Sequence, residues 1–152
     1  STMVVVSPNT PMGEYTRKAN EETFLIIQME EQHAVDQAER IGEVEGVDIL
    51  FLGPGDFTSL SGIPGQMDHP KLWKAYEAVA KAAEKTGKYW GTPAFNPEHA
   101  RKLMDMGALF FCHTADLVIL KQGLEQIIDK FSPLGFEFDN HIAADGKSYL
   151  QG

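Results

Sequence analysis

The stretch FLIIQMEEQHAVDQAERIGEVEGVDILFLGPGDF, residues 24–57, contains the pattern that decides the fold. Two apolar runs, residues 23–30 and 47–54, have the length of strands and flank a segment whose apolar residues are spaced as in a helix. The first run ends at Glu30, and Asp56 follows directly after the second. The pattern predicts a strand, a helix and a second strand, with an acid at the end of each strand.

The same alternation continues toward the C-terminus. Residues 69–88 form the clearest helical segment, with Pro70 suited to the first turn and Gly87 suited to the stop. The apolar positions expected on one face of this helix are Leu72, Ala75, Tyr76, Val79 and Ala83. The other expected elements are strands over residues 88–94 and 108–115 and helices over residues 31–44, 96–107 and 116–131.

Four strand-then-helix units in succession indicate βα crossovers in a parallel sheet, so we expect an α/β fold. Strands that are apolar throughout are typical of sheets covered on both faces. We expect residues 14–131 to form this repeating region, after an irregular segment at residues 1–13 and before a tail at residues 132–152 that has no sustained period. Ligands of such sheets bind at the C-terminal ends of the strands.

Composition narrows the classes of function. The net charge of −9 argues against a nucleic-acid surface, which needs a basic face. No apolar run approaches the roughly 18 residues of a membrane span, and the N-terminal stretch has no signal-peptide pattern. The single cysteine, Cys112, excludes an internal disulfide framework and favours a cytoplasmic protein. Because Cys112 lies in an apolar strand, we expect it to be inert core.

The two strand-end acids are the first candidates for chemistry. The ends of neighbouring strands lie about 5 Å apart, and two carboxylates that close repel each other unless a cation lies between them. A hydrated Mg²⁺ or Mn²⁺ suits such oxygen ligands, so Glu30 and Asp56 are candidate metal ligands. The alternative is that each acid caps the helix that follows it.

The segment GPGDF, residues 53–57, is the second candidate. As a loop it would leave backbone N–H groups at Gly53 and Gly55 free to bind a small carboxylate. Gln28 points to the same face of its strand as Glu30 and could bind a ligand oxygen. An ordinary glycine turn is the alternative.

Other polar residues give weaker signals. Thr92, Pro93 and His113 also fall at predicted strand ends, and His113 could enter the site or be structural. Asp116 is expected to cap the last helix. The histidines expected at the solvated surface are His33, His69 and His99.

Residues 26–62 resemble the HpcH/HpaI group of metal-dependent class II pyruvate aldolases, and the likeness extends from about Glu14 to Ile127, most of the chain. The group has an apolar strand ending Q-x-E and, about 26 residues later, G-P-x-D-[LF]-S, which Gln28-Met29-Glu30 and Gly53-Pro54-Gly55-Asp56-Phe57 match, with Thr58-Ser59 where one Ser is usual. The resemblance implies a TIM (β/α)₈ barrel in which Glu30 and Asp56 ligate Mg²⁺, Mn²⁺ or Co²⁺. It further implies that Gln28 positions pyruvate or a 2-oxo acid and that the backbone at Gly55 and Asp56 holds its carboxylate.

The chain departs from this group in extent. A (β/α)₈ barrel has about 250 residues, whereas this chain resembles only the last four of eight units, a half-barrel. The group's catalytic arginine and histidine lie on the missing strands, and neither Arg17 nor His113 is their counterpart, so we assign no catalytic residue.

Three functions are open at this stage. The first is an aldolase that cleaves or forms 4-hydroxy-2-oxo acids, giving pyruvate and an aldehyde. The second is a catalytically incomplete fragment that binds metal and oxo-acid or serves as an assembly unit. The third, a lyase of the citryl- or malyl-CoA type, would require a basic nucleotide-binding patch that the sequence lacks.

A half-barrel would need a partner to cover its open surfaces. It would expose two open sheet edges and an apolar face. We therefore expect either a homo-oligomer or completion by an N-terminal half-barrel. The resemblance also implies that residues 117–152 pack on a neighbouring subunit.

Overall fold

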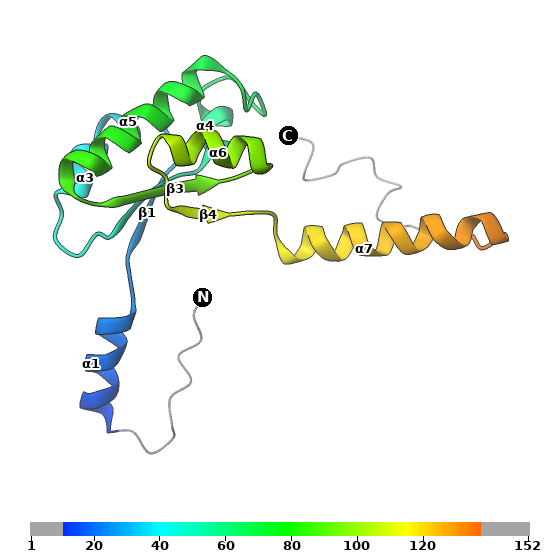
Figure 1. Ribbon diagram of the computed structural model, residues 1–152, viewed down its shortest axis with the longest axis horizontal. Helices are drawn as coiled ribbons and strands as arrows, with labels where there is room; N and C mark the ends of the chain where they lie inside the picture. The colour runs from blue at the N-terminus through cyan, green and yellow to red at the C-terminus, as the bar shows by residue number, and fades with distance from the viewer. Residues whose placement is uncertain (1–10, 138–152) are drawn as a thin grey trace.

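The computed structural model describes residues 11–137, which contain one sheet of four parallel strands in the order β1-β2-β3-β4 (Figure 1). The strands are β1 (Ile26–Met29), β2 (Ile49–Leu52), β3 (Tyr89–Pro93) and β4 (Phe110–Cys112). The helices are α1 (Met12–Glu22), α2 (Gln32–Asp36), α3 (Ala38–Gly42), α4 (Pro54–Leu60), α5 (Pro70–Thr86), α6 (Pro97–Asp105), α7 (Asp116–Phe131) and the 3₁₀ turn η1 (Ser132–Leu134). The predicted parallel α/β architecture is confirmed.

Helix α5 follows its sequence signals closely. Pro70 occupies the first helical position, where its missing N–H costs nothing. Gly87 ends the helix in the left-handed conformation at φ 68°, which glycine adopts without strain. All five residues expected on the apolar face are buried.

The segment expected as one helix over residues 31–44 is two short helices, α2 and α3. Gln37 lies between them with φ −104° and ψ 6°, outside the helical region. Of the residues with helical apolar spacing in this segment, Ala38 is buried, whereas Val44 follows the end of α3 and is 55% exposed. The apolar spacing predicted the helical character of the segment and missed the break at Gln37.

Helices α2 to α6 lie over one face of the sheet (Figure 1). Leu50, Leu52 and Trp90 pack against α5 in the main core. The alternate residues of each strand point to the other face of the sheet. On that face, strand pairing brings four residues side by side in one row: Gln28, Phe51, Gly91 and Phe110. In a complete barrel this second face is the interior.

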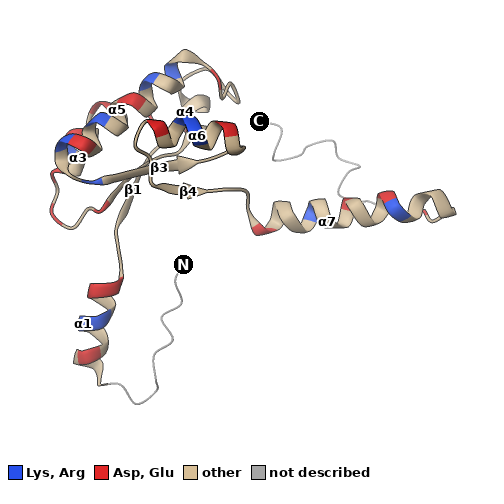
Figure 2. Cartoon of the chain, in the orientation of Figure 1, with Lys and Arg blue, Asp and Glu red and all other residues tan. Residues whose placement is uncertain are grey.

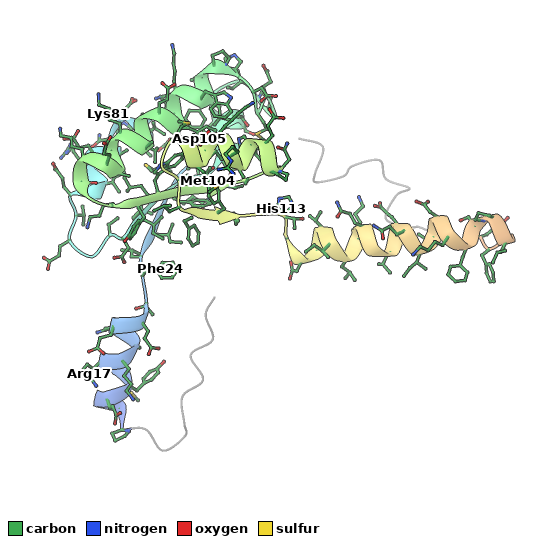
Figure 3. The ribbon with its side chains drawn as sticks, viewed as in Figure 1. Arg17, Phe24, Lys81, Met104, Asp105 and His113 are labelled. Atoms are coloured by element: carbon green, nitrogen blue, oxygen red, sulfur yellow. The ribbon has the colours of Figure 1, made fainter. Side chains whose placement is uncertain are left out.

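Aromatic side chains fill the space over Gly91 on this second face. The ring centroids of Phe51 and Phe110 lie 6.0 Å apart, across a strand that has no side chain between them. Phe24 adds a further contact, with its ring centroid 6.1 Å from that of Phe110. Figure 3 shows Phe24 in the connection between α1 and β1.

Helices α1 and α7 extend away from the sheet and contain no buried residue (Figure 1). Six large apolar residues of α7 are exposed: Leu117, Ile119, Leu120, Leu124, Ile127 and Phe131. Charged residues of both signs line α3, α5 and α6, whereas β3 and β4 carry none (Figure 2). Within residues 11–137, no helix has the length and apolar character needed to cross a membrane.

The predicted terminal segments lie mostly outside the described residues. Of the segment at residues 1–13 only residues 11–13 are described, and α1 begins there at Met12. Of the tail at residues 132–152 only residues 132–137 are described, and they begin with η1.

His99 is buried, at 8% exposure, so the prediction that it lies at the solvated surface is wrong. Its ring stacks on Phe95 with centroids 4.8 Å apart and meets the edges of Trp73 and Tyr76. The His99 Nδ1 accepts a hydrogen bond from the Phe95 backbone N–H, and the His99 backbone N–H donates to the Asn96 side chain that caps α6. Tertiary packing, which helical spacing does not reveal, draws the ring inward. His33 is exposed as expected, and His69 is half-buried.

His99 makes stability depend on pH. Burial lowers the pKa of His99 below 6.5, an effect opposed by Asp68 and reinforced by Lys102. The unfolded chain therefore binds more protons between the folded pKa and 6.5, so the free energy of unfolding falls as pH falls through this window. His99→Gln should flatten that fall in urea titrations at pH 7.5 and 5.5, while the exposed control His33→Gln should retain it. Equal pH dependence in both variants would contradict this assignment.

Candidate active site

The ends of β1 and β2 place Glu30 beside Gly53. Met29 is in register with Leu52, and the Gly53 N–H donates to the Met29 carbonyl at 2.9 Å. Glu30 follows Met29 and Gly53 follows Leu52, so Glu30 and Gly53 lie side by side where the two strands end. Both lie at the C-terminal edge of the sheet, where parallel α/β folds bind ligands.

Gln28 and Glu30 form a pair that lies directly over Gly53. The Gln28 Nε2 donates to Glu30 Oε1 at 2.6 Å. A Cβ added at Gly53 would lie 2.9 Å from Gln28 Nε2 and 3.0 Å from Glu30 Cγ. Only glycine leaves room for the pair, and the amide fixes the orientation of the Glu30 carboxylate.

The segment GPGDF is not a loop, because α4 begins within it. Gly53 is the N-cap and Pro54 the first helical residue, a favoured position for proline. Asp56 is the third helical residue and is exposed, as is Gly55. The backbone N–H groups at Gly55 and Asp56 belong to the first turn, whose donors have no intrahelical partner.

The capping alternative for the two acids is wrong. The N-cap of α2 is Glu31 rather than Glu30, and the N-cap of α4 is Gly53 rather than Asp56. Neither helix has a side-chain hydrogen bond at its cap. Asp56 still interacts favourably with the positive end of α4, as an acid in a first turn does.

The residues present fit a hydrated, hard divalent cation. Glu30 and Asp56 are carboxylates, the oxygen ligands that Mg²⁺ and Mn²⁺ accept while keeping bound water, and Gln28 holds the Glu30 carboxylate beside Gly53. Over residues 11–137 there is no cluster of three or more His, Cys, Asp or Glu that could hold a metal.

The other strand ends have structural contacts. Thr92 is fully buried, and its hydroxyl donates to the Leu52 carbonyl at 2.8 Å, which ties β3 to β2. His113 lies where β4 leads into α7 (Figure 3), with Nδ1 2.7 Å from the Ala94 carbonyl. Because a carbonyl only accepts, Nδ1 carries the hydrogen. His113 therefore links two loops.

Two predictions near β4 are wrong. Cys112 is exposed rather than buried, because β4 is an edge strand of the described sheet and Cys112 lies on the face opposite the helices. Asp116 is the first residue of α7 and not its cap, which is Ala115. The Asp116 carboxylate accepts from the Leu117 N–H instead.

The structure thus consists of consecutive βα units in one parallel sheet, as in half of a (β/α)₈ barrel, and the C-terminal edge of the sheet carries Gln28, Glu30, Gly53 and Asp56. Residues 2–121 match the model of the HpcH/HpaI aldolase/citrate lyase family, and the chain belongs to that family.

Relatives with established names support this assignment. The chain is 30% identical over 118 residues to a 5-keto-4-deoxy-D-glucarate aldolase of Enterobacter sp. strain 638 and to a 4-hydroxy-2-oxo-heptane-1,7-dioate aldolase of Escherichia coli strain SE11. Each match covers 78% of this chain, and 46% and 45% of the respective relative. The chain thus spans about half the length of the curated relatives it matches.

Solved structures give the same picture. An HpcH/HpaI aldolase from Desulfitobacterium hafniense matches with a TM-score of 0.70 and 28% identity, covering 80% of this chain and 48% of that one. A family protein from Burkholderia cenocepacia matches with a TM-score of 0.67 and 30% identity, covering 78% and 46%. The TIM-barrel-type fold and its partial extent agree with the sequence-based expectation.

Proposed function

We propose that this chain supplies the metal- and oxo-acid-binding half of an aldolase that cleaves or forms a C–C bond in 4-hydroxy-2-oxo acids, giving pyruvate and an aldehyde. The observation that carries the proposal is the Gln28–Glu30 pair over Gly53, at the ligand-binding edge of an HpcH/HpaI-family sheet. The names of the two aldolase relatives favour lyase chemistry on oxo-acids.

Each site residue has a proposed task. Glu30 and Asp56 hold Mg²⁺, Mn²⁺ or Co²⁺, and Gln28 orients Glu30 through its amide while facing the bound acid. First-turn N–H groups at Gly55 and Asp56, with the backbone of Gly53, receive the carboxylate of that acid. When bound, the metal supplies a Lewis acid for a keto oxygen.

A second candidate is a binding module without turnover. Among residues 11–137, neither Arg17 nor His113 meets Glu30: Arg17 pairs with Glu21 on α1, and His113 contacts Ala94. A proton donor for C–C cleavage would then come from outside the residues that form the Glu30 site. This observation favours a half-site that depends on further strands.

We further propose that the chain works in an assembly, either with copies of itself or with an N-terminal half-barrel. The edge strands β1 and β4 and the exposed apolar side chains of α7 support this. The exposed thiol of Cys112 fits the proposed cytoplasmic setting, where thiols stay reduced.

Pyruvate release from a 4-hydroxy-2-oxo acid tests the proposal. Pyruvate release by the wild-type chain with Mn²⁺ present would support turnover, and Glu30→Gln or Asp56→Asn should then abolish it, because each removes a proposed metal ligand. Glu43→Gln, a change at an exposed acid beyond α3, is the matched control and should retain release. Calorimetric pyruvate binding without release would favour the binding module, and release that survives both ligand variants would contradict the proposal.

A further inference from the structure

Thr58 is a buried polar residue next to the candidate site. It lies in α4 with 0% exposure, two residues after Asp56. Its hydroxyl donates to the Gly55 carbonyl at 2.9 Å. That bond alone is common for threonine in a helix, so any further role depends on the other contacts of this side chain.

The second contact of the hydroxyl reaches outside the helix. The Gly65 N–H donates to Thr58 Oγ1 at 3.3 Å, and the Ile63 N–H donates to the Thr58 carbonyl at 2.9 Å. Gly65 adopts a left-handed backbone conformation, with φ +70°, which glycine adopts without strain, and its N–H points to Thr58. Thr58 thus joins α4 to the connection between α4 and α5.

The hydrogen bond from Thr58 to the Gly55 carbonyl holds the peptide unit that joins Gly55 to Asp56. The carbonyl of Gly55 and the N–H of Asp56 belong to one planar group, so a bond to the carbonyl fixes the orientation of that plane. Ser59 donates to the same carbonyl at 3.0 Å, but its side chain is exposed. Of the two hydroxyls, only that of Thr58 also engages the following loop.

We propose that Thr58 is a positioning residue for Asp56. It holds the first turn of α4 against residues 63–65 and thereby sets the direction of the Asp56 carboxylate. The inference rests on the proposed function, in which Asp56 is a metal ligand. Groups that orient metal ligands typically change metal affinity about 10–100-fold when removed. Thr58 does not touch the metal or the substrate in this proposal.

Mn²⁺ titration calorimetry of the full chain tests the proposal. Thr58→Val removes the hydroxyl, and with it both the bond to the Gly55 carbonyl and the acceptor of the Gly65 N–H, so the Mn²⁺ Kd should rise about tenfold or more. Thr58→Ser keeps the hydroxyl and should restore affinity to within about twofold. Ser59→Ala removes the exposed hydroxyl from the same carbonyl and should also stay within about twofold. Thr58→Ala serves as a second hydroxyl-free variant if the valine variant does not fold.

The slowing of hydrogen exchange by bound metal distinguishes a positioning role of Thr58 from a purely structural one. In the wild type, saturating Mg²⁺ should slow exchange in peptides covering residues 56–65, and in Thr58→Val this response should vanish. Unchanged Mn²⁺ affinity in Thr58→Val would overturn the role of Thr58 and leave the proposed function intact. No Mn²⁺ binding by the wild type would overturn the proposed function and this inference with it.

Discussion

Gly53→Ala is expected to weaken Mn²⁺ binding by about tenfold or more with little change in stability. The new Cβ would lie 2.9 Å from Gln28 Nε2, closer than real Cβ contacts. Gln28 Nε2 ends a flexible side chain, so it can move aside at small cost to the fold. That movement breaks its 2.6 Å bond to Glu30 and releases the carboxylate from its fixed direction.

Calorimetry with Mn²⁺ and thermal unfolding, measured on the same samples, check this result. Gly13→Ala is the control, because a Cβ at Gly13 in α1 meets no atom within 4 Å. The control should bind Mn²⁺ as the wild type does. Wild-type affinity in Gly53→Ala would mean that the Gln28–Glu30 pair does not prepare a metal ligand.

Gly91→Ala is expected to destabilise the fold by about 3 kcal/mol or more, or to prevent folding. Gly91 is paired with Phe110 across β3 and β4. A Cβ at position 91 would lie 2.0 Å from the Phe110 carbonyl oxygen and 2.8 Å from its carbonyl carbon. Both are backbone atoms, so only separation of the two strands could relieve the overlap.

Urea unfolding measures this effect. Gly123→Ala is the matched control, since Gly123 lies in α7 with no atom within 4 Å of the added Cβ. Its free energy of unfolding should equal that of the wild type or exceed it by up to about 1 kcal/mol, because alanine has the higher helix propensity. Equal stability of the two variants would show that β3 and β4 tolerate a side chain at position 91.

Sequence signals predicted well those helices whose limits are set by residues within the helix or next to it. The limits of α5 follow from Pro70 and Gly87, and its buried face follows from helical spacing. The first helix turn after β2 was missed because Gly53-Pro54 indicates the end of a strand as much as the start of a helix. Proline at a first helical position, with an acid two residues later, is the signal that identifies α4.

Features set by distant contacts could not be predicted in this way. His99 is buried by aromatic rings from α5 and from the loop before α6, and Cys112 is exposed because β4 has no further neighbour in the described sheet. Strand spacing predicted that Glu30 would lie at the ligand-binding edge. The close approach of side chains to Gly53 and the link from Thr58 to Gly65 depend on backbone positions that spacing does not specify.

Pyruvate titration into the chain, with and without Mn²⁺, tests the central claim most directly. The claim is that Glu30 and Asp56 hold a divalent metal to which a 2-oxo acid binds. We expect calorimetric pyruvate binding only with Mn²⁺ present, and its loss on adding EDTA or in Asp56→Asn. Pyruvate binding that is equally strong without metal, or that survives Asp56→Asn unchanged, would contradict the claim.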